Sequence, residues 1–306
     1  LAGMLIVGVI FGPYCLNLID PSVLHISAEL RRIALIIILI RAGLNLKIDD
    51  LKKVGRPALL LSFLPAVSEL TAFLIFAPKI LGITVLEAAV MGAVLAAVSP
   101  AVVVPRMVFL IDEKYGTEKN IPQMILAGAS LDDVFVIVLF TTFLGMAQGE
   151  AVNVLSFANI PISIFMGIVI GAICGIVLAY LFETAYAKQN MIRNSMKVII
   201  VLGVAFLLLA IEEWLNRIVA VSGLLAVMSM ALVLAMRSAQ SVTTRLQQKF
   251  GKLWLAAEVI LFVLVGAAVD IRYTLKGGLP AVTMIMIGLL FRSVGVWISV
   301  LGTKLN

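Results

Sequence analysis

The chain has 306 residues, of which 62% are hydrophobic and only 13% are charged. A water-soluble chain of this length cannot bury so much apolar surface, so the composition excludes a soluble globular fold and makes lipid the solvent. The net charge of +6 could indicate a nucleic-acid partner, but an excess of basic residues on one side of a membrane explains it better, and no nucleic acid is expected.

Ten apolar stretches follow one another along the chain, and most are long enough to cross a bilayer. None shows the strand-like alternation of an outer-membrane barrel, so all are predicted to be helices. We therefore expect an all-α polytopic membrane protein with about ten transmembrane helices, forming one transmembrane domain over residues 1–306. The stretches are 1–19, 30–46, 57–77, 84–111, 121–147, 158–182, 195–211, 218–236, 253–271 and 279–301.

The basic residues of the loops are unequally divided between the two sides of the membrane. Alternating the loops puts fourteen on one side and six on the other, and the positive-inside rule makes the richer side cytoplasmic. Both ends of the chain would then lie in the cytoplasm, and we expect the cytoplasmic membrane of a prokaryote as its location. The fourteen are Lys47, Lys52, Lys53, Arg56, Arg106, Lys114, Lys119, Lys188, Arg193, Lys197, Arg237, Arg245, Lys249 and Lys252.

The most polar of the connecting segments is RSAQSVTTRLQQKFGK, residues 237–252. Two interpretations are open for it. It is either an amphipathic helix that lies on the cytoplasmic surface and joins two halves of the bundle, or a plain connector.

The stretch 84–111 contains two prolines, Pro100 and Pro105, in the run AAVSPAVVVPRM. Proline removes a backbone donor and clashes with the preceding turn, so both are expected to break or unwind the helix around Ser99 and Pro100. Carbonyl groups freed in this way need partners in a membrane: buried protein, water or an ion. Many secondary transporters build their ion sites from such discontinuous helices, whereas a simple kink is the structural alternative.

Two adjacent carboxylates, Asp132 and Asp133, lie in the middle of the apolar stretch 121–147. One carboxylate at bilayer depth costs roughly 2.5–3.5 kcal/mol on insertion scales, so an adjacent pair indicates a function. The two resist ionising together, and a site that holds one proton or one cation is what a proton-coupled carrier needs. Consecutive helical residues point about 100° apart, so one acid is expected to face the ion cavity and the other a neighbouring helix.

Two further charges, Glu69 and Arg292, lie at the centres of apolar stretches and cannot easily reach water. Each requires a partner. A mutual Glu69–Arg292 ion pair is one arrangement, and Arg292 beside Asp132 is another. A purely structural salt bridge is the alternative to a functional role.

No glycine-rich nucleotide loop, metal-ligand cluster or nucleophile–base arrangement is found, so we expect neither a cofactor nor an enzyme. An intramembrane aspartyl protease would need its two acids on facing helices, whereas Asp132 and Asp133 are adjacent on one. The pair therefore favours transport over peptide cleavage.

Five segments together resemble the cation:proton antiporter superfamily, and more narrowly its NHA-type sodium/hydrogen antiporters. They occur in the expected order through nearly the whole chain, and VSPAVVVP followed by LDD is the most specific combination. The segments are GVIFGP at 8–13, LIRAGLNL at 39–46, AVSPAVVVPRM at 97–107, KYGTEKNIPQMILAGASLDDVF at 114–135 and LLFRSVGVW at 289–297.

The resemblance implies a role for each matching residue. Ser99 and Pro100 correspond to the broken-helix crossover, and Asp133 to the main ligand of the transported Na⁺ or Li⁺ and carrier of the proton, with Asp132 beside it. Arg292 stands where strongly electrogenic relatives have a lysine, and Glu69 is expected to pair with it. Arginine stays protonated, so Arg292 cannot carry a proton.

The resemblance also implies the architecture. It predicts inverted repeats, a dimerisation panel, an ion-translocating core that moves like an elevator, and a homodimer. A second broken helix should follow the stretch 279–301, and another helix should precede Leu1, so we expect the 306 residues to be incomplete at both ends.

The expected function is exchange of Na⁺ or Li⁺ for H⁺ by alternating access. Potassium/proton exchange stays open because selectivity depends on cavity size and carbonyl placement. A channel or sensor relative that has lost exchange is the other alternative.

Overall fold

The computed structural model describes residues 2–46, 55–147, 159–187, 193–215 and 219–303, and a few side chains within these ranges, including those of Pro100 and Asp133, lie outside the description. Four of the fourteen basic residues that make one side cytoplasmic, Lys47, Lys52, Lys53 and Lys188, also lie outside it.

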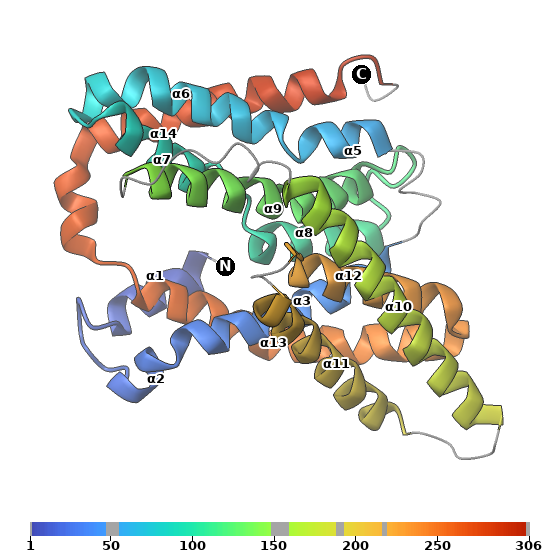
Figure 1. Cartoon of the computed structure of the whole chain (residues 1–306). Coiled ribbons are helices and arrows are strands. Elements are labelled where there is room, and N and C mark those ends of the chain that lie inside the picture. Colours follow the sequence, from blue (N-terminus) through green and yellow to red (C-terminus); the bar gives the residue numbers. More distant parts are fainter. Residues whose placement is uncertain (1, 47–54, 148–158, 188–192, 216–218, 304–306) are drawn as a thin grey trace. The chain divides into compact units, whose positions relative to one another are not determined.

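The regular elements of the described ranges are thirteen α-helices (Figure 1). They confirm an all-α chain. The helices are α1 (Ala2–Phe11), α2 (Pro21–His25), α3 (Ser27–Asn45), α5 (Gly55–Leu61), α6 (Leu64–Leu81), α7 (Val85–Leu95), α8 (Pro100–Asp112), α9 (Ile121–Ala147), α10 (Asn159–Ala187), α11 (Asn194–Leu215), α12 (Gly223–Arg237), α13 (Gln240–Ala267) and α14 (Ile271–Val300).

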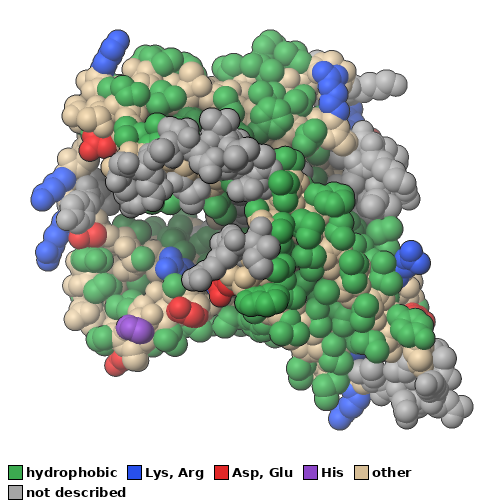
Figure 2. All heavy atoms as spheres, in the orientation of Figure 1, with side chains coloured by type: hydrophobic (Ala, Val, Ile, Leu, Met, Phe, Trp, Pro, Cys, Tyr) green, Lys and Arg blue, Asp and Glu red, His purple; other side chains and the backbone are tan. Residues whose placement is uncertain are grey.

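Five helical stretches of the described chain are long and apolar enough to cross a membrane: Gly55–Leu81, Pro161–Thr184, Asn194–Leu215, Gln240–Ala267 and Lys276–Val300. Shorter apolar helices accompany them. Hydrophobic side chains occupy much of the surface seen in Figure 2, and many large ones are exposed, such as Phe165, Leu207 and Leu290. Lipid is the medium that such a surface requires.

The prediction of one helix over residues 1–19 is wrong, because α1 ends at Phe11 and turns follow it. Pro13 comes two residues after the end of the helix and cannot donate a backbone hydrogen bond. The residues after the helix form turns instead, held by backbone hydrogen bonds such as the 3.0 Å bond from Leu16 N–H to the carbonyl oxygen of Ile10. The apolar residues after Phe11 are therefore not part of a span.

The interpretation of residues 237–252 as a surface helix or connector separate from the next span is also wrong. After a short link, α13 begins at Gln240 and runs without interruption to Ala267. Leu246 and Phe250 in its polar half are buried, like Trp254 and Leu261 further on. Because one face of the whole helix is buried, the polar segment and the apolar span form a single element.

The stretch 84–111 is interrupted as expected, but by one proline and not two. The helix α7 ends at Leu95 and α8 begins at Pro100, the first helical position, where a missing N–H costs nothing. Pro105 lies inside α8 and does not end it.

The chain divides into two compact units, each with its own packing. The first comprises residues 1–45, 168–211 and 226–276, and in it α13 packs against α1 and α3. The second comprises residues 46–167, 212–225 and 277–306. In that unit α9 packs against α5, α7 and α8, α7 packs against α6, and α14 runs beside α6 (Figure 1), with Phe76 and Phe291 edge to face.

Glycines allow the closest helix contacts of the first unit. A Cβ built on Gly266 of α13 would lie 2.2 Å from the carbonyl oxygen of Leu5, and one on Gly8 of α1 would lie 2.1 Å from the carbonyl oxygen of Val263. Both distances are far below van der Waals contact, so α1 and α13 pack backbone to backbone there, as small residues permit in membranes.

Gly266→Ala should therefore destabilise the protein by about 1–3 kcal/mol, because the added methyl group forces the two backbones apart. Unfolding of the detergent-solubilised protein by heat or denaturant measures the change. Gly251→Ala is the matched control in the same helix, since a Cβ there would meet nothing within 4 Å and Ala is the better helix former. Equal stability of the two variants would contradict the close packing.

Candidate functional site

The second unit contains an interrupted helix in which four residues, Ala96 to Ser99, lie between α7 and α8. A capping box begins α7: the Thr84 hydroxyl accepts from Glu87 N–H, and the Glu87 carboxylate accepts from Thr84 N–H. Ser99 is extended (φ −72°, ψ 110°), its hydroxyl makes no capping bond, and its carbonyl accepts from Val102 and Val103. The interruption therefore exposes backbone groups that the helices themselves do not satisfy.

Asp132 of α9 satisfies one of these groups. Its Oδ2 accepts a hydrogen bond of 2.9 Å from the backbone N–H of Val98, inside the interruption. The residue is completely buried, and its other oxygen, Oδ1, has no hydrogen-bond partner among the described residues. Buried Ala66, Ala96 and Val136 form an apolar cluster in the same unit. A buried carboxylate with one oxygen anchored and one open is a ready acceptor for a proton or a cation.

Arg292 of α14 satisfies a second backbone group of the interruption, the carbonyl of Ala96. Its Nη1 donates to Oε2 of Glu69 on α6 at 2.5 Å and to the carbonyl oxygen of Ala96 at 2.9 Å. The side chains of Glu69 and Arg292 are only 7% and 19% exposed. One guanidinium thus joins α14, α6 and the end of α7, in a position where its charge is paired and hydrogen-bonded.

A glycine leaves space for this ion pair. A Cβ on Gly288, one helical turn before Arg292, would lie 3.2 Å from Oε1 of Glu69 and 3.0 Å from the ring of Phe73. Any larger residue at this position would have to displace the carboxylate or the ring.

The charges around the interruption do not cancel. Asp132 is near enough to both members of the Glu69–Arg292 pair for their charges to interact with it. Two carboxylates and one guanidinium leave one negative charge when all are ionised. A proton or a monovalent cation on the open Asp132 oxygen would neutralise it, and the buried surroundings make neutralisation favourable.

The structure brings together most of the residues selected from the sequence. Asp132, Ser99, Glu69 and Arg292 all belong to the second unit, and Arg292 is paired with Glu69, the first of the two arrangements left open. Pro100 is the first residue of α8. Asp133 follows Asp132 in α9, but its side chain lies outside the described part of the structure.

Sequence reasoning expected free backbone groups around Ser99 and Pro100, but it missed which groups Asp132 and Arg292 bind, and it missed one glycine of the site. The N–H of Val98 and the carbonyl of Ala96 act through atoms that every residue has, so no residue type marks them. The two prolines were the only signal that carbonyl and amide groups would be free here. Gly288 could have been suspected only from its place one turn before Arg292.

A buried carboxylate that contacts an interrupted helix, in a chain with several helices long enough to span a membrane, is the arrangement from which many secondary transporters build their ion sites. The chain belongs to the family described as sodium/hydrogen exchanger, transmembrane, whose model matches residues 1–306. The membership makes it a multi-pass membrane protein and confirms the resemblance to cation:proton antiporters.

Relatives in animals match parts of the chain. The sodium/hydrogen exchanger 9B2 of Homo sapiens is 32% identical over 245 residues, which are 80% of this chain and 44% of that protein. The 9B2 protein of Xenopus tropicalis is 41% identical over 154 residues (50% and 29%), and the human 9B1 protein is 40% identical over 149 residues (47% and 29%). The chain spans less than half the length of each.

The fold is similar to that of a solved archaeal antiporter. The structure of the sodium proton antiporter MjNhaP1 from Methanocaldococcus jannaschii at pH 8 matches with a TM-score of 0.74 and 24% identity, covering 99% of this chain and 72% of that one. An electron microscopy map of the same antiporter gives a TM-score of 0.76. The helices of this chain therefore have an antiporter-like arrangement.

Replacing Arg292 by Gln should destabilise the protein by about 3–5 kcal/mol, because Glu69 is left buried without its counter-charge and Ala96 loses its donor. Glu69→Gln should cost less, since Arg292 keeps the Ala96 carbonyl and the charge of Asp132. Denaturant unfolding in detergent measures both variants.

The matched control for Arg292→Gln is Arg106→Gln, because Arg106 is exposed and its guanidinium lies 5.9 Å from the ring centre of Phe109. That change should cost about 0.5–1 kcal/mol. If Arg292→Gln cost no more than the control, the ion pair would not hold the site together.

Proposed function

We propose that the protein exchanges Na⁺ or Li⁺ for H⁺ across the membrane by alternating access. The observation that carries this proposal is the buried Asp132 carboxylate, anchored by one oxygen to the interrupted helix and open at the other. Membership of the sodium/hydrogen exchanger family supports it. The 9B2 relatives are named sodium/hydrogen exchangers, and the similar archaeal structure is that of a sodium proton antiporter.

Coupling follows from competition for carboxylates. Asp133 binds either a proton or a partly dehydrated cation, never both, and only the loaded carrier changes its access from one side to the other. Asp132, held by Val98 N–H, adds negative potential beside it and tunes its affinity for protons. Backbone carbonyls around Ser99 and Pro100 replace water lost by the cation, as unwound helices do in other transporters.

Arg292 acts in this mechanism as a fixed charge. Its guanidinium holds the end of α7 through Ala96 and is balanced by Glu69. Because it stays protonated, it carries no proton itself, and the exchanged proton has to travel on a carboxylate.

The finer architecture is part of the proposal. About ten transmembrane helices form a panel and an ion-translocating core related by inverted repeats, and two copies pair through the panel as a homodimer. The protein lies in the cytoplasmic membrane of a prokaryote, with both ends of this chain on the cytoplasmic side, as the distribution of basic residues favours.

Asp133→Asn and Asp132→Asn should each abolish cation-driven proton flux, because an amide can neither carry the proton nor supply the negative charge. The full-length protein is assayed in everted vesicles from a host without its own antiporters, where a pH-sensitive dye follows the collapse of a proton gradient. Na⁺, Li⁺ and K⁺ are added separately.

Asp20→Asn is the matched control, since Asp20 is an exposed cap of α2 that accepts from Ser22 N–H at 2.8 Å and Asn caps equally well. Dequenching with Na⁺ and Li⁺ but not K⁺ is expected. A response to K⁺ alone would show that the protein is a potassium exchanger. Unchanged cation-driven proton flux in Asp133→Asn would contradict the carboxylate mechanism. Ohmic conductance without proton coupling would indicate a channel.

Competition also predicts a pH dependence. As the pH falls, protons occupy more of the binding carboxylate, so the apparent KM for Na⁺ should rise while the maximal rate at saturating Na⁺ is kept. Initial rates of dye dequenching at several pH values measure this. An apparent KM that does not change with pH would contradict a single site shared by Na⁺ and H⁺.

A further inference from the structure

A second polar site lies in the first unit, and none of the residues of the proposed transport mechanism lines it. It is a partly open cavity of about 420 Å³ formed by the polar half of α13 and the first residue of α11. Its lining consists of three cations and two amides: Arg245, Lys249, Lys252, Asn194 and Gln248. Among the described residues, no acid lines it.

The helix α13 presents these cations on one face. Arg245, Gln248, Lys249 and Lys252 follow the spacing i, i+3, i+4 and i+7, which places side chains on one side of a helix. The buried residues Leu246 and Phe250 occupy the other side. The lining residues of α13 are therefore exposed because the helix packs through its opposite face.

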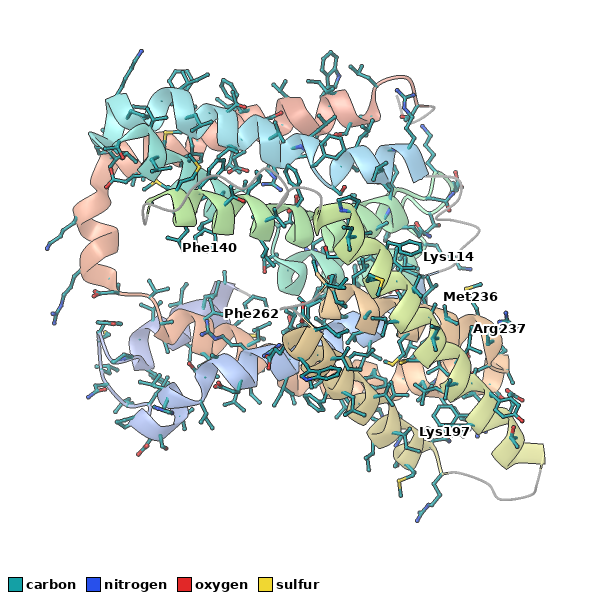
Figure 3. All side chains as sticks on the ribbon, in the orientation of Figure 1. Lys114, Phe140, Lys197, Met236, Arg237 and Phe262 are labelled. Atoms are coloured by element: carbon teal, nitrogen blue, oxygen red, sulfur yellow. The ribbon has the colours of Figure 1, made fainter. Side chains whose placement is uncertain are left out.

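The positive charge of the cavity is not compensated within the described part of the chain, where Arg245, Lys249 and Lys252 make neither a hydrogen bond nor an ion pair. The charge of the buried Lys197, which does not line the cavity, also interacts with that of Arg245. Lys197 packs against α10, with its Nζ 5.4 Å from the ring centre of Phe182 (Figure 3).

The acid that interacts with Lys197 makes its hydrogen bond elsewhere. Glu183 of α10 interacts with Lys197, and its Oε1 accepts a bond of 3.1 Å from Ala239 N–H, at the start of α13. It does not line the cavity. Three cations that converge without a counter-charge form a site for an anion.

The exposed face of α13 indicates where this site lies along the membrane normal. Up to Lys252 the exposed residues are cationic or polar, and immediately beyond it they are apolar, with Leu255 66% exposed and Val259 46% exposed. A change from basic to apolar on one helix face is typical of the boundary between lipid headgroups and acyl chains. The cavity is thus at headgroup depth.

We propose that this cavity binds the phosphate group of an anionic membrane lipid. A phosphate monoester carries about 1.5–2 negative charges at neutral pH and strong acceptor oxygens, which match two lysines and a bidentate arginine. The amides of Asn194 and Gln248 supply further donors. A lipid is favoured over a soluble phosphate because the apolar continuation of the same face accommodates its acyl chains.

The test measures binding of a fluorescent phosphatidic acid to the purified full-length protein in detergent at fixed ionic strength. The double variant Lys249→Gln/Lys252→Gln should bind about tenfold or more weakly, because each basic residue near a headgroup contributes to affinity. Lys119→Gln, which removes an exposed charge outside the cavity, should change the affinity by less than about twofold. Lys249→Arg/Lys252→Arg keeps the charge and should bind nearly as the unchanged protein does.

Three results would overturn the proposal. Unchanged binding by the double Gln variant would remove the cavity as the site. Equal weakening by Lys119→Gln would mean attraction to net charge alone. Inorganic phosphate that occupies the site as tightly as phosphatidic acid would assign the cavity to a soluble phosphate instead of a lipid. Melting temperatures of all variants, with the Arg variant as reference, separate loss of binding from loss of folding.

Discussion

The structure of the second unit depends on the high cost of leaving a charge or a backbone polar group unsatisfied in lipid. Where α7 stops before α8 begins, four residues leave the helix, and their amide and carbonyl groups need partners. Asp132 accepts from the amide of Val98, and Arg292 donates to the carbonyl of Ala96. These two side chains would themselves be too costly to bury alone. The interruption and the buried charges stabilise one another, and neither would be tolerated without the other.

The same cost explains how the first unit distributes its polar residues. Its closest helix contacts are made by small residues, with Gly8 and Gly266 allowing α1 and α13 to touch through their backbones. Three of its cations, Arg245, Lys249 and Lys252, are exposed on the polar half of α13, and charge costs little where water or lipid headgroups can reach it. Lys197 is buried, and the ring of Phe182 and the carboxylate of Glu183 compensate its charge. Buried charges in both units therefore have partners, and the three cations of α13 are exposed instead.

The comparisons and the geometry contribute different parts of the functional conclusion. The family model covers the whole chain and shows that it belongs to the sodium/hydrogen exchanger family, and the archaeal antiporter shows the fold at 24% identity. The side-chain contacts in this chain supply a chemical reason for the proposed exchange. One oxygen of Asp132 is anchored, and the other has no hydrogen-bond partner among the described residues, while the nearby guanidinium of Arg292 cannot release its proton. In the proposed mechanism, proton and cation binding are therefore alternatives at the carboxylates.

The sequence by itself determined the solvent, the helical class and the position of the interruption. Its hydrophobic content excluded water as the medium, Pro100 marked the start of α8, and Asp132 with Asp133 marked the acids at depth. Only the tertiary structure decided which residues the buried charges pair with. Glu69 and Arg292 are 223 positions apart, and the sequence left Arg292 with two possible acidic partners.

The end of α1 at Phe11 and the continuity of α13 were predicted wrongly from the sequence. Hydropathy reports whether a segment tolerates lipid, and does not report which face of a helix another helix covers. Val98 and Ala96 contribute only main-chain atoms, and packing alone determines where such atoms lie.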